Sequence, residues 1–156
     1  MMMNLSYNVV AALGNRTLAT AESCTGGGIG AAITSVSGSS KVYKGGIISY
    51  TTDVKIAQLH VDPEVIDREG AVSSSVAEAM AVGVRNALGT DIAVSTTGLA
   101  GPGGDDYGNP VGTVYIGYAE ANCVFSRKFL FNGDREAVRQ QAVSAALEIL
   151  LHQIGE

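Results

Sequence analysis

The sequence is poor in the residues that build metal sites, disulfides and histidine-based catalysis. Of its 156 residues only two are cysteine, Cys24 and Cys123, and only two are histidine, His60 and His152. No Cys-x-x-Cys pair is present and the histidines stand alone in the sequence. The pattern argues against a structural zinc site and predicts reduced thiols.

Basic tracts and long apolar runs are also missing. No run of five basic residues occurs and the formal net charge is −5, so no segment is typical of nucleic-acid binding. No apolar stretch reaches the length of a membrane span, and the first five residues lack the basic flank and apolar core of a signal peptide. We therefore expect a cytoplasmic protein that binds neither nucleic acid nor membrane.

Charged residues make up only 16% of the chain and hydrophobic residues 46%, which fits one domain with a packed core over residues 1–156. Helical and strand patterns alternate through the first two thirds, which favours parallel strands, and a hairpin follows. The predicted fold is α/β, a three-layer α/β/α sandwich with a mixed, mostly parallel sheet. Strands are expected at 17–21, 46–50, 91–97, 111–119 and 122–131. Helices are expected after a cap at Asn4, over 29–36, over 53–60 with a stop at 61–63, from 73 to 88 with a capping box of Ser75 and Glu78, and after a cap at Asp134.

The most informative segment is Ala21-Glu22-Ser23-Cys24-Thr25-Gly26-Gly27-Gly28, which lies between a predicted strand and a predicted helix. A helix N-terminus supplies free N–H donors and a partial positive charge, so this turn suits a nucleophile or an anion. A tight turn whose glycines only allow close packing is the alternative. Cys24 would have a lowered pKa there, yet small buried cysteines are commoner than reactive ones, so Ser23 and Cys24 both stay open as nucleophiles.

Lys55 is the candidate base for a serine nucleophile. In an α/β sheet, the loops at the carboxyl ends of parallel strands form the ligand crevice, which would bring together 22–24, 50–55 and the segment from 98 onward. Neither histidine accompanies these loops, which argues against a Ser-His-Asp triad. A buried lysine of lowered pKa can serve as base to a serine, whereas the alternative is a solvated lysine on a helix surface.

Two further segments attract attention. The glycine-rich stretch 98–110 is too long for a simple turn and could present N–H groups to an anion or carbonyl, although its two aspartates fit a solvated face better. Arg135 and Arg139 lie one turn apart at the start of the last helix, where cations oppose the helix dipole. Two arginines on one helix face suit a phosphate or carboxylate, unless they pair with Asp134 and Glu136 or with a neighbouring subunit.

In order and spacing, six sequence blocks resemble the CinA carboxy-terminal-domain family, whose single-domain members include nicotinamide-nucleotide amidases. The blocks are Ala21-Glu22-Ser23-Cys24-Thr25-Gly26-Gly27, Ser49-Tyr50 with Lys55, Gly70-Ala71-Val72-Ser73, Gly98-Leu99-Ala100-Gly101-Pro102-Gly103-Gly104, Pro110-Val111-Gly112-Thr113-Val114, and Gly133-Asp134-Arg135 with Arg139-Gln140.

The resemblance implies an α/β/α fold and hydrolysis of the carboxamide of nicotinamide mononucleotide, without metal or cofactor. It places Ser23 at the nucleophile position and Lys55 at the base position, with Tyr50 as a third catalytic residue. The implied substrate-binding residues are Cys24, Thr25, Gly26, Thr97, Gly98, Arg135 and Arg139. The expected partner is a pyridine mononucleotide, and a homo-oligomer is expected. A non-catalytic pyridine-nucleotide-binding or regulatory module of the same family is the alternative function.

Overall fold

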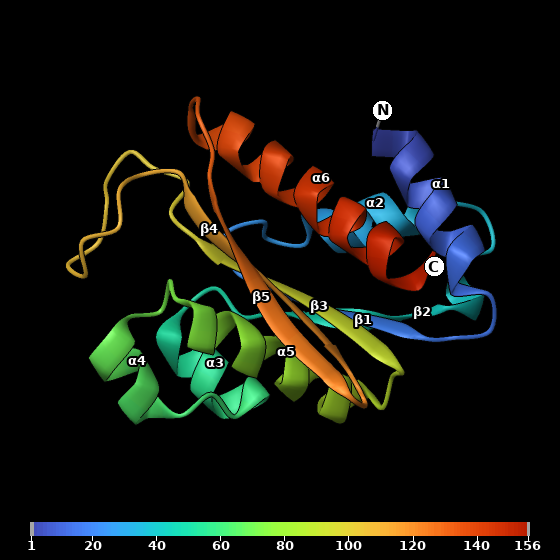
Figure 1. Ribbon diagram of the computed structural model, residues 1–156, viewed down its shortest axis with the longest axis horizontal. Helices are drawn as coiled ribbons and strands as arrows, with labels where there is room; N and C mark the ends of the chain where they lie inside the picture. The colour runs from blue at the N-terminus through green and yellow to red at the C-terminus, as the bar shows by residue number, and fades with distance from the viewer. Residues whose placement is uncertain (1, 156) are drawn as a thin grey trace.

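A five-stranded mixed sheet forms the middle layer of the computed structural model, which describes residues 2–155 (Figure 1). The strand order is β2-β1-β3-β4-β5. β1 pairs in parallel with both β2 and β3, whereas β3 with β4 and β4 with β5 are antiparallel pairs. Within the described chain, β4 therefore runs against the other four strands, and the predicted mixed sheet is confirmed. The strands are β1 (Leu18–Glu22), β2 (Tyr43–Ile48), β3 (Ile92–Gly98), β4 (Thr113–Glu120) and β5 (Cys123–Leu130).

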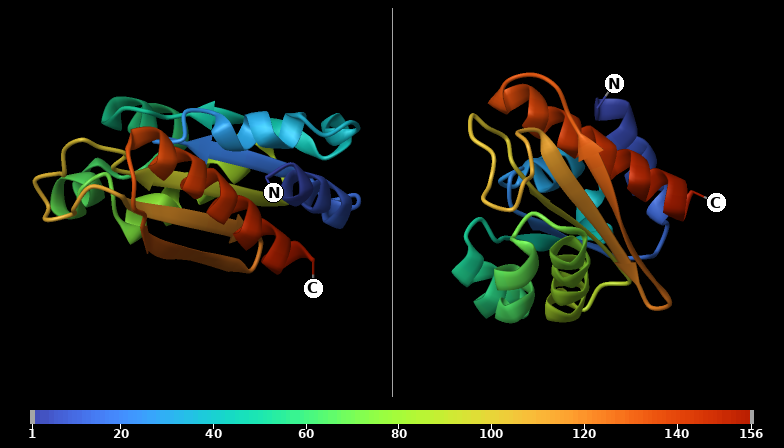
Figure 2. Two further views of the ribbon diagram at one scale, coloured as in Figure 1. Left: turned by 90° about the horizontal axis from the view of Figure 1, so that it is seen from above. Right: turned by 60° about the vertical axis from the view of Figure 1, so that its left-hand side comes forward.

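Helices cover both faces of this sheet, which gives the predicted three layers (Figures 1 and 2). One face carries α1 (Met2–Leu13), α2 (Gly28–Thr34) and α6 (Arg135–Ile154), and the other carries α3 (Thr52–Leu59), α4 (Pro63–Glu69) and α5 (Ser74–Leu88). Each face has its own apolar cluster, centred on residues such as Ile33 and Leu150 on the first face and Leu59 and Met80 on the second. A short 3₁₀ helix (Ser39–Lys41) precedes β2.

The interior strand β1 is buried along its whole length because it has a neighbour on each side and helices on both faces. The edge strand β2 instead alternates between partly buried and exposed residues. Ser23 follows β1 directly, and its amide extends the ladder by donating to the carbonyl of Thr96 at 3.1 Å. The nucleophile candidate is therefore attached to the most enclosed strand of the fold.

Two details of the predicted elements are wrong. α4 is not among the predicted elements, because the pattern at 61–63 predicts a helix stop. Asp62 instead caps α4 by accepting from the amide of Glu64 at 2.9 Å, and Pro63 occupies the first helical turn, where its missing N–H costs nothing. β2 begins at Tyr43 and ends at Ile48, which leaves Ser49 and Tyr50 in the following loop.

Two predicted helix caps are also wrong. α5 is capped by Ser73, whose hydroxyl accepts from the amide of Val76 at 3.3 Å, while Ser75 donates to the carboxylate of Glu69 at 2.9 Å. Asn4 lies inside α1. The predicted cap at Asp134 is confirmed, since its carboxylate accepts from the amide of Ala137 at 2.9 Å.

Candidate active site

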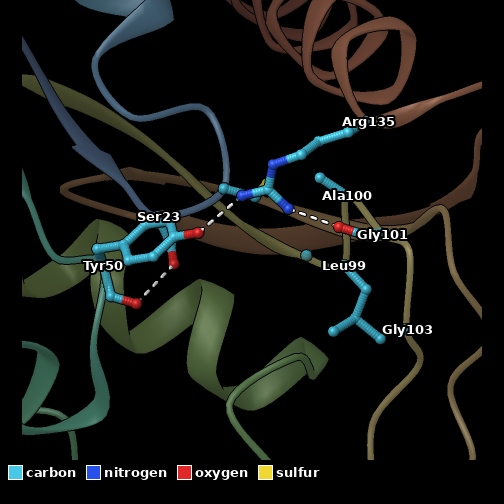
Figure 3. Close-up of a pocket in the computed structure, with 9 residues that line it drawn as sticks. Ser23, Tyr50, Leu99, Ala100, Gly101, Gly103 and Arg135 are labelled. Atoms are coloured by element: carbon cyan, nitrogen blue, oxygen red, sulfur yellow. Dashed lines mark hydrogen bonds between the residues drawn. The ribbon is translucent and has the colours of Figure 1, made fainter.

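A pocket of about 290 Å³ opens where the carboxyl ends of the parallel strands meet the first turn of α6 (Figure 3). Ser23 and Cys24 enter it from the loop after β1, Tyr50 from the loop after β2, and Arg135 from α6. The segment after β3 supplies the remaining wall, with Gly98, Leu99, Ala100, Gly101 and Gly103. The predicted convergence of the three loops is thus present.

Lys55 lies next to Ser23 in the protein interior, and its side chain is only 2% exposed. Its Nζ is 3.0 Å from Ser23 Oγ, 2.8 Å from the carbonyl oxygen of Ser49 and 3.2 Å from that of Tyr50. No carboxylate of the described chain forms an ion pair with it. Burial therefore dominates and lowers the pKa of Lys55 to about 8 from its ordinary 10.5. The alternative of a solvated helix lysine is excluded.

Cys24 also lines the pocket, but its surroundings disfavour the thiolate. Burial is the largest cause, and together with the nearby Glu22 carboxylate it outweighs the opposing influence of the Cys24 backbone amide, Lys55 and Arg139. The pKa of Cys24 is raised to about 11, so the thiol stays protonated at neutral pH. The hydroxyl of Ser23 has the contact with Lys55, which distinguishes the two neighbours.

Glu22 is the residue that the sequence reasoning missed. Its buried carboxylate accepts from the hydroxyl of Thr25 at 2.7 Å and from the amides of Ile29 and Gly30, both at 2.9 Å. The amides at the start of α2 are thus already paired, and the expectation that they offer free donors to a ligand is wrong. The available signal was an acidic side chain just before a helix N-terminus, where the dipole stabilises negative charge.

The two arginines of α6 have different surroundings, and neither pairs with Asp134 or Glu136 in the described chain. Arg135 bridges the mouth of the pocket, donating to the carbonyl of Gly101 at 2.6 Å and to the hydroxyl of Tyr50 at 2.9 Å (Figure 3). Arg139 lies outside the lining and donates to the carbonyls of Cys24 and Thr25 at 3.0 and 3.3 Å. The structure separates a pair that the sequence treats as equivalent.

Of the remaining predicted binding residues, Gly98 lines the pocket, whereas Thr25, Gly26 and Thr97 are not among its lining residues. Thr25 is buried against Glu22, and Thr97 donates through its hydroxyl to the carbonyl of Ala71 at 2.8 Å. Gly26 has a φ of +58°, in the left-handed region that favours glycine. These residues shape the loops around the pocket.

The long loop between β3 and β4 is tied to the helical face beside it. The hydroxyl of Tyr107 donates to the carbonyl of Asp67 at 2.7 Å, and the side-chain amide of Asn109 donates to the carbonyl of Val72 at 3.1 Å. Asp105 accepts from the backbone amides of Tyr107 and Asn109, both at 3.0 Å. This aspartate organises the loop, which the expectation of a merely solvated face had missed.

Residues 2–155 contain neither a metal-binding cluster nor a membrane-spanning helix. No three His, Cys, Asp or Glu side chains gather there as a metal-binding group. No helix in that range is long and apolar enough to cross a membrane.

Comparison with known proteins places these features in a family. Residues 3–154 match the family described as "CinA C-terminal domain". A CinA-like protein of Thermosynechococcus vestitus is 49% identical over 142 residues, which are 89% of this chain and 34% of that protein. The chain thus spans about a third of the length of such CinA-like relatives.

A relative of similar length is the nicotinamide-nucleotide amidohydrolase PncC of Pseudomonas putida, 48% identical over 141 residues, or 90% of this chain and 88% of that protein. Among solved structures, a CinA superfamily protein of Klebsiella pneumoniae has a TM-score of 0.96 at 32% identity, covering 99% of this chain and 98% of that one. The competence/damage inducible protein CihA of Agrobacterium tumefaciens has a TM-score of 0.93 at 35% identity, covering 97% of this chain and 94% of that one. The chain therefore belongs to the CinA C-terminal domain family.

Proposed function

We propose that this protein is an amidohydrolase that converts nicotinamide mononucleotide to nicotinate mononucleotide and ammonia. The observation that carries the proposal is the contact of 3.0 Å between a buried lysine amine and a serine hydroxyl in the pocket. The substrate class rests on the name of the PncC relative, which aligns over most of both chains.

The contacts of Lys55 favour its role as the base. A protonated amine has three N–H donors, and Lys55 has three oxygen neighbours. When the amine is neutral, the carbonyls of Ser49 and Tyr50 can hold its two remaining N–H groups. Its lone pair then faces Ser23, whose hydroxyl otherwise donates weakly to the carbonyl of Tyr50 at 3.4 Å. A pKa of Lys55 near 8 supplies a useful fraction of this neutral form.

The reaction then follows a serine amidase scheme. Lys55 takes the proton of Ser23 as its oxygen bonds to the carboxamide carbon, and the ammonium form returns that proton to the amide nitrogen as the C–N bond breaks. Ammonia leaves and water hydrolyses the acyl-enzyme with the same base. The amides of Cys24 and Thr25 donate to no other residue of the described chain, which makes them the candidate donors to the oxyanion.

Arg135 is the proposed anchor for the phosphate of the substrate. Its bonds to Gly101 and Tyr50 use two of the five guanidinium N–H groups, so three remain for an anion at the pocket mouth. Binding the remote phosphate would orient the carboxamide at Ser23, because it converts binding energy into position at the reacting carbon.

The test is ammonia release from nicotinamide mononucleotide by the purified protein, with the Ser23→Ala variant as the matched control. Release by the wild type and none by the variant would support the proposal. Calorimetric binding of the nucleotide without release at any pH would instead indicate a non-catalytic nucleotide-binding module.

A further inference from the structure

The Arg139 side chain binds the backbone of the loop that carries Ser23, the proposed nucleophile. Its guanidinium contacts the carbonyl oxygens of the two residues that follow Ser23, at 3.0 Å for Cys24 and 3.3 Å for Thr25. It is partly buried and lies outside the pocket lining, whereas Arg135 lines it. No carboxylate of residues 2–155 forms an ion pair with it. Its cationic field therefore acts on the peptide groups of this loop.

The packing around Arg139 brings α6 close to the loop. A Cβ at Gly26 would lie 3.4 Å from the guanidinium, and a Cβ at Gly28 would lie 2.8 Å from the side chain of Val143 one turn further along α6. These glycines allow the helix to approach the backbone directly. Glu22 holds the same segment through Thr25 and the first amides of α2. A cation thus binds the carbonyls of the loop while a carboxylate binds amides further along it.

Because peptide groups are planar, the contacts of Arg139 with the loop carbonyls also orient the N–H groups of the loop. In a planar trans peptide the C=O and N–H bonds point in opposite directions. A Cys24 carbonyl held by Arg139 therefore directs the Thr25 N–H away from the guanidinium. The Thr25 carbonyl does the same for Gly26, whose N–H closes the turn on the carbonyl of Ser23 at 3.0 Å. That last bond in turn orients the N–H of Cys24.

We propose that Arg139 is a positioning residue, which holds the Cys24 and Thr25 amides in place to stabilise the oxyanion formed at Ser23. The inference rests on the proposed serine mechanism, and it replaces the expected role of Arg139 as a phosphate ligand. Fixed amide donors act strongly because they need no rearrangement during the reaction. A cation at the carbonyl side also polarises these peptide groups.

The decisive probe is diisopropyl fluorophosphate, a neutral reagent with no anionic group for an arginine to bind. Ser23 Oγ bonds to phosphorus, the P–F bond breaks, fluoride leaves and Lys55 takes the hydroxyl proton. We expect the wild type to be labelled and Ser23→Ala to be unlabelled. Arg139→Ala should react at least about tenfold more slowly, because it loses oriented donors. Arg139→Lys should recover part of the rate, and Gln140→Ala, a neighbouring exposed position, should match the wild type.

The outcomes distinguish this inference from the proposed function. Labelling of Arg139→Ala and Arg139→Lys at the wild-type rate would overturn the positioning role while leaving the serine mechanism standing. An unlabelled wild type would overturn both.

Steady-state kinetics give a second measurement. Arg139→Ala should lower kcat by a similar factor for nicotinamide mononucleotide and for nicotinamide riboside, with KM nearly unchanged. A rise in KM confined to the phosphorylated substrate would reassign Arg139 to the phosphate. If the alanine variant unfolds, as thermal unfolding would show, the lysine variant carries both comparisons.

Discussion

The amine of Lys55 lies 3.0 Å from the hydroxyl of Ser23 and is held there by two backbone carbonyls rather than by a carboxylate. A carboxylate partner would stabilise the ammonium form and raise the pKa. Carbonyl partners fix the position of the amine while burial keeps its pKa low. Position and basicity are thus set by separate features of the same site.

Removing the proposed nucleophile should separate the chemical step from substrate binding. Ser23→Ala is expected to lower ammonia release by at least about a thousandfold, while calorimetric affinity for nicotinamide mononucleotide stays close to that of the wild type. Cys24→Ser is the matched control and should keep most of the activity. An active Ser23→Ala together with an inactive Cys24→Ser would reverse the assignment of the nucleophile.

The activity should rise with pH through the pKa of Lys55, at about 8. Only the neutral amine accepts a proton, so kcat/KM is expected to increase about tenfold per pH unit below this value and to level off above it. Lys55→Arg should be nearly inactive, since arginine keeps its charge at every working pH. A flat pH profile between 6 and 9, or an active arginine variant, would remove Lys55 as the base.

The buried Lys55 should also lower the free energy of unfolding of the protein. Its pKa is about 8 in the folded chain and about 10.5 when unfolded, so between these values the unfolded chain binds more protons. The free energy of unfolding should therefore rise as pH increases from 8 to 10.5. Below pH 8 the destabilisation caused by Lys55 has its full value. Lys55→Met should raise the unfolding free energy at pH 7 by at most about 3 kcal/mol and abolish activity. Urea denaturation would measure this, and a destabilised methionine variant would contradict it.

Arg135 should matter to the phosphate more than to the carboxamide. Arg135→Ala is expected to raise KM for nicotinamide mononucleotide by roughly tenfold or more, because a charge-assisted hydrogen bond is lost. The effect on nicotinamide riboside, which lacks the phosphate, should be much smaller. Equal losses on the two substrates would show that Arg135 serves the loops it bridges instead.

Glu22 should be needed for the stability of the nucleophile loop. Both of its carboxylate oxygens accept from donors, so a glutamine at this position must turn its NH₂ group toward at least one N–H or O–H. Glu22→Gln should therefore lower the unfolding free energy by about 1–3 kcal/mol. Glu64→Gln, at an exposed position on α4, is the control, and equal melting temperatures for the two variants would refute the role.

The sequence was sufficient for the layers and the mixed sheet. Apolar periodicity and loop position identify β1, β3 and the segment around Ser23. Spacing left Lys55 open between a base and a surface lysine, and only the family resemblance assigned it to the base position. Asp62-Pro63 was misread because the same two residues that end one helix also begin another. The resemblance to the family is confirmed, whereas the expected homo-oligomer and cytoplasmic location stay predictions.

The individual roles of Arg135 and Arg139 could not be predicted, because helical spacing gives the face of a side chain and not its partner. Both arginines lie on one face of α6, yet the first reaches a loop after β3 and the second a loop after β1. The structural role of Glu22 could not be predicted for a similar reason. Its partners Ile29 and Gly30 contribute backbone amides, which leave no mark in the sequence.

Arg139 and the Cys24 carbonyl that it holds are 115 residues apart in the chain. During synthesis, the segment containing Ser23 leaves the ribosome long before α6 exists. The β1 strand must also wait for β3, whose residues pair with it across the centre of the sheet. A nascent or truncated chain that ends before α6 therefore carries Ser23, the proposed nucleophile, without Arg139, and catalytic competence should appear late, with the last helix.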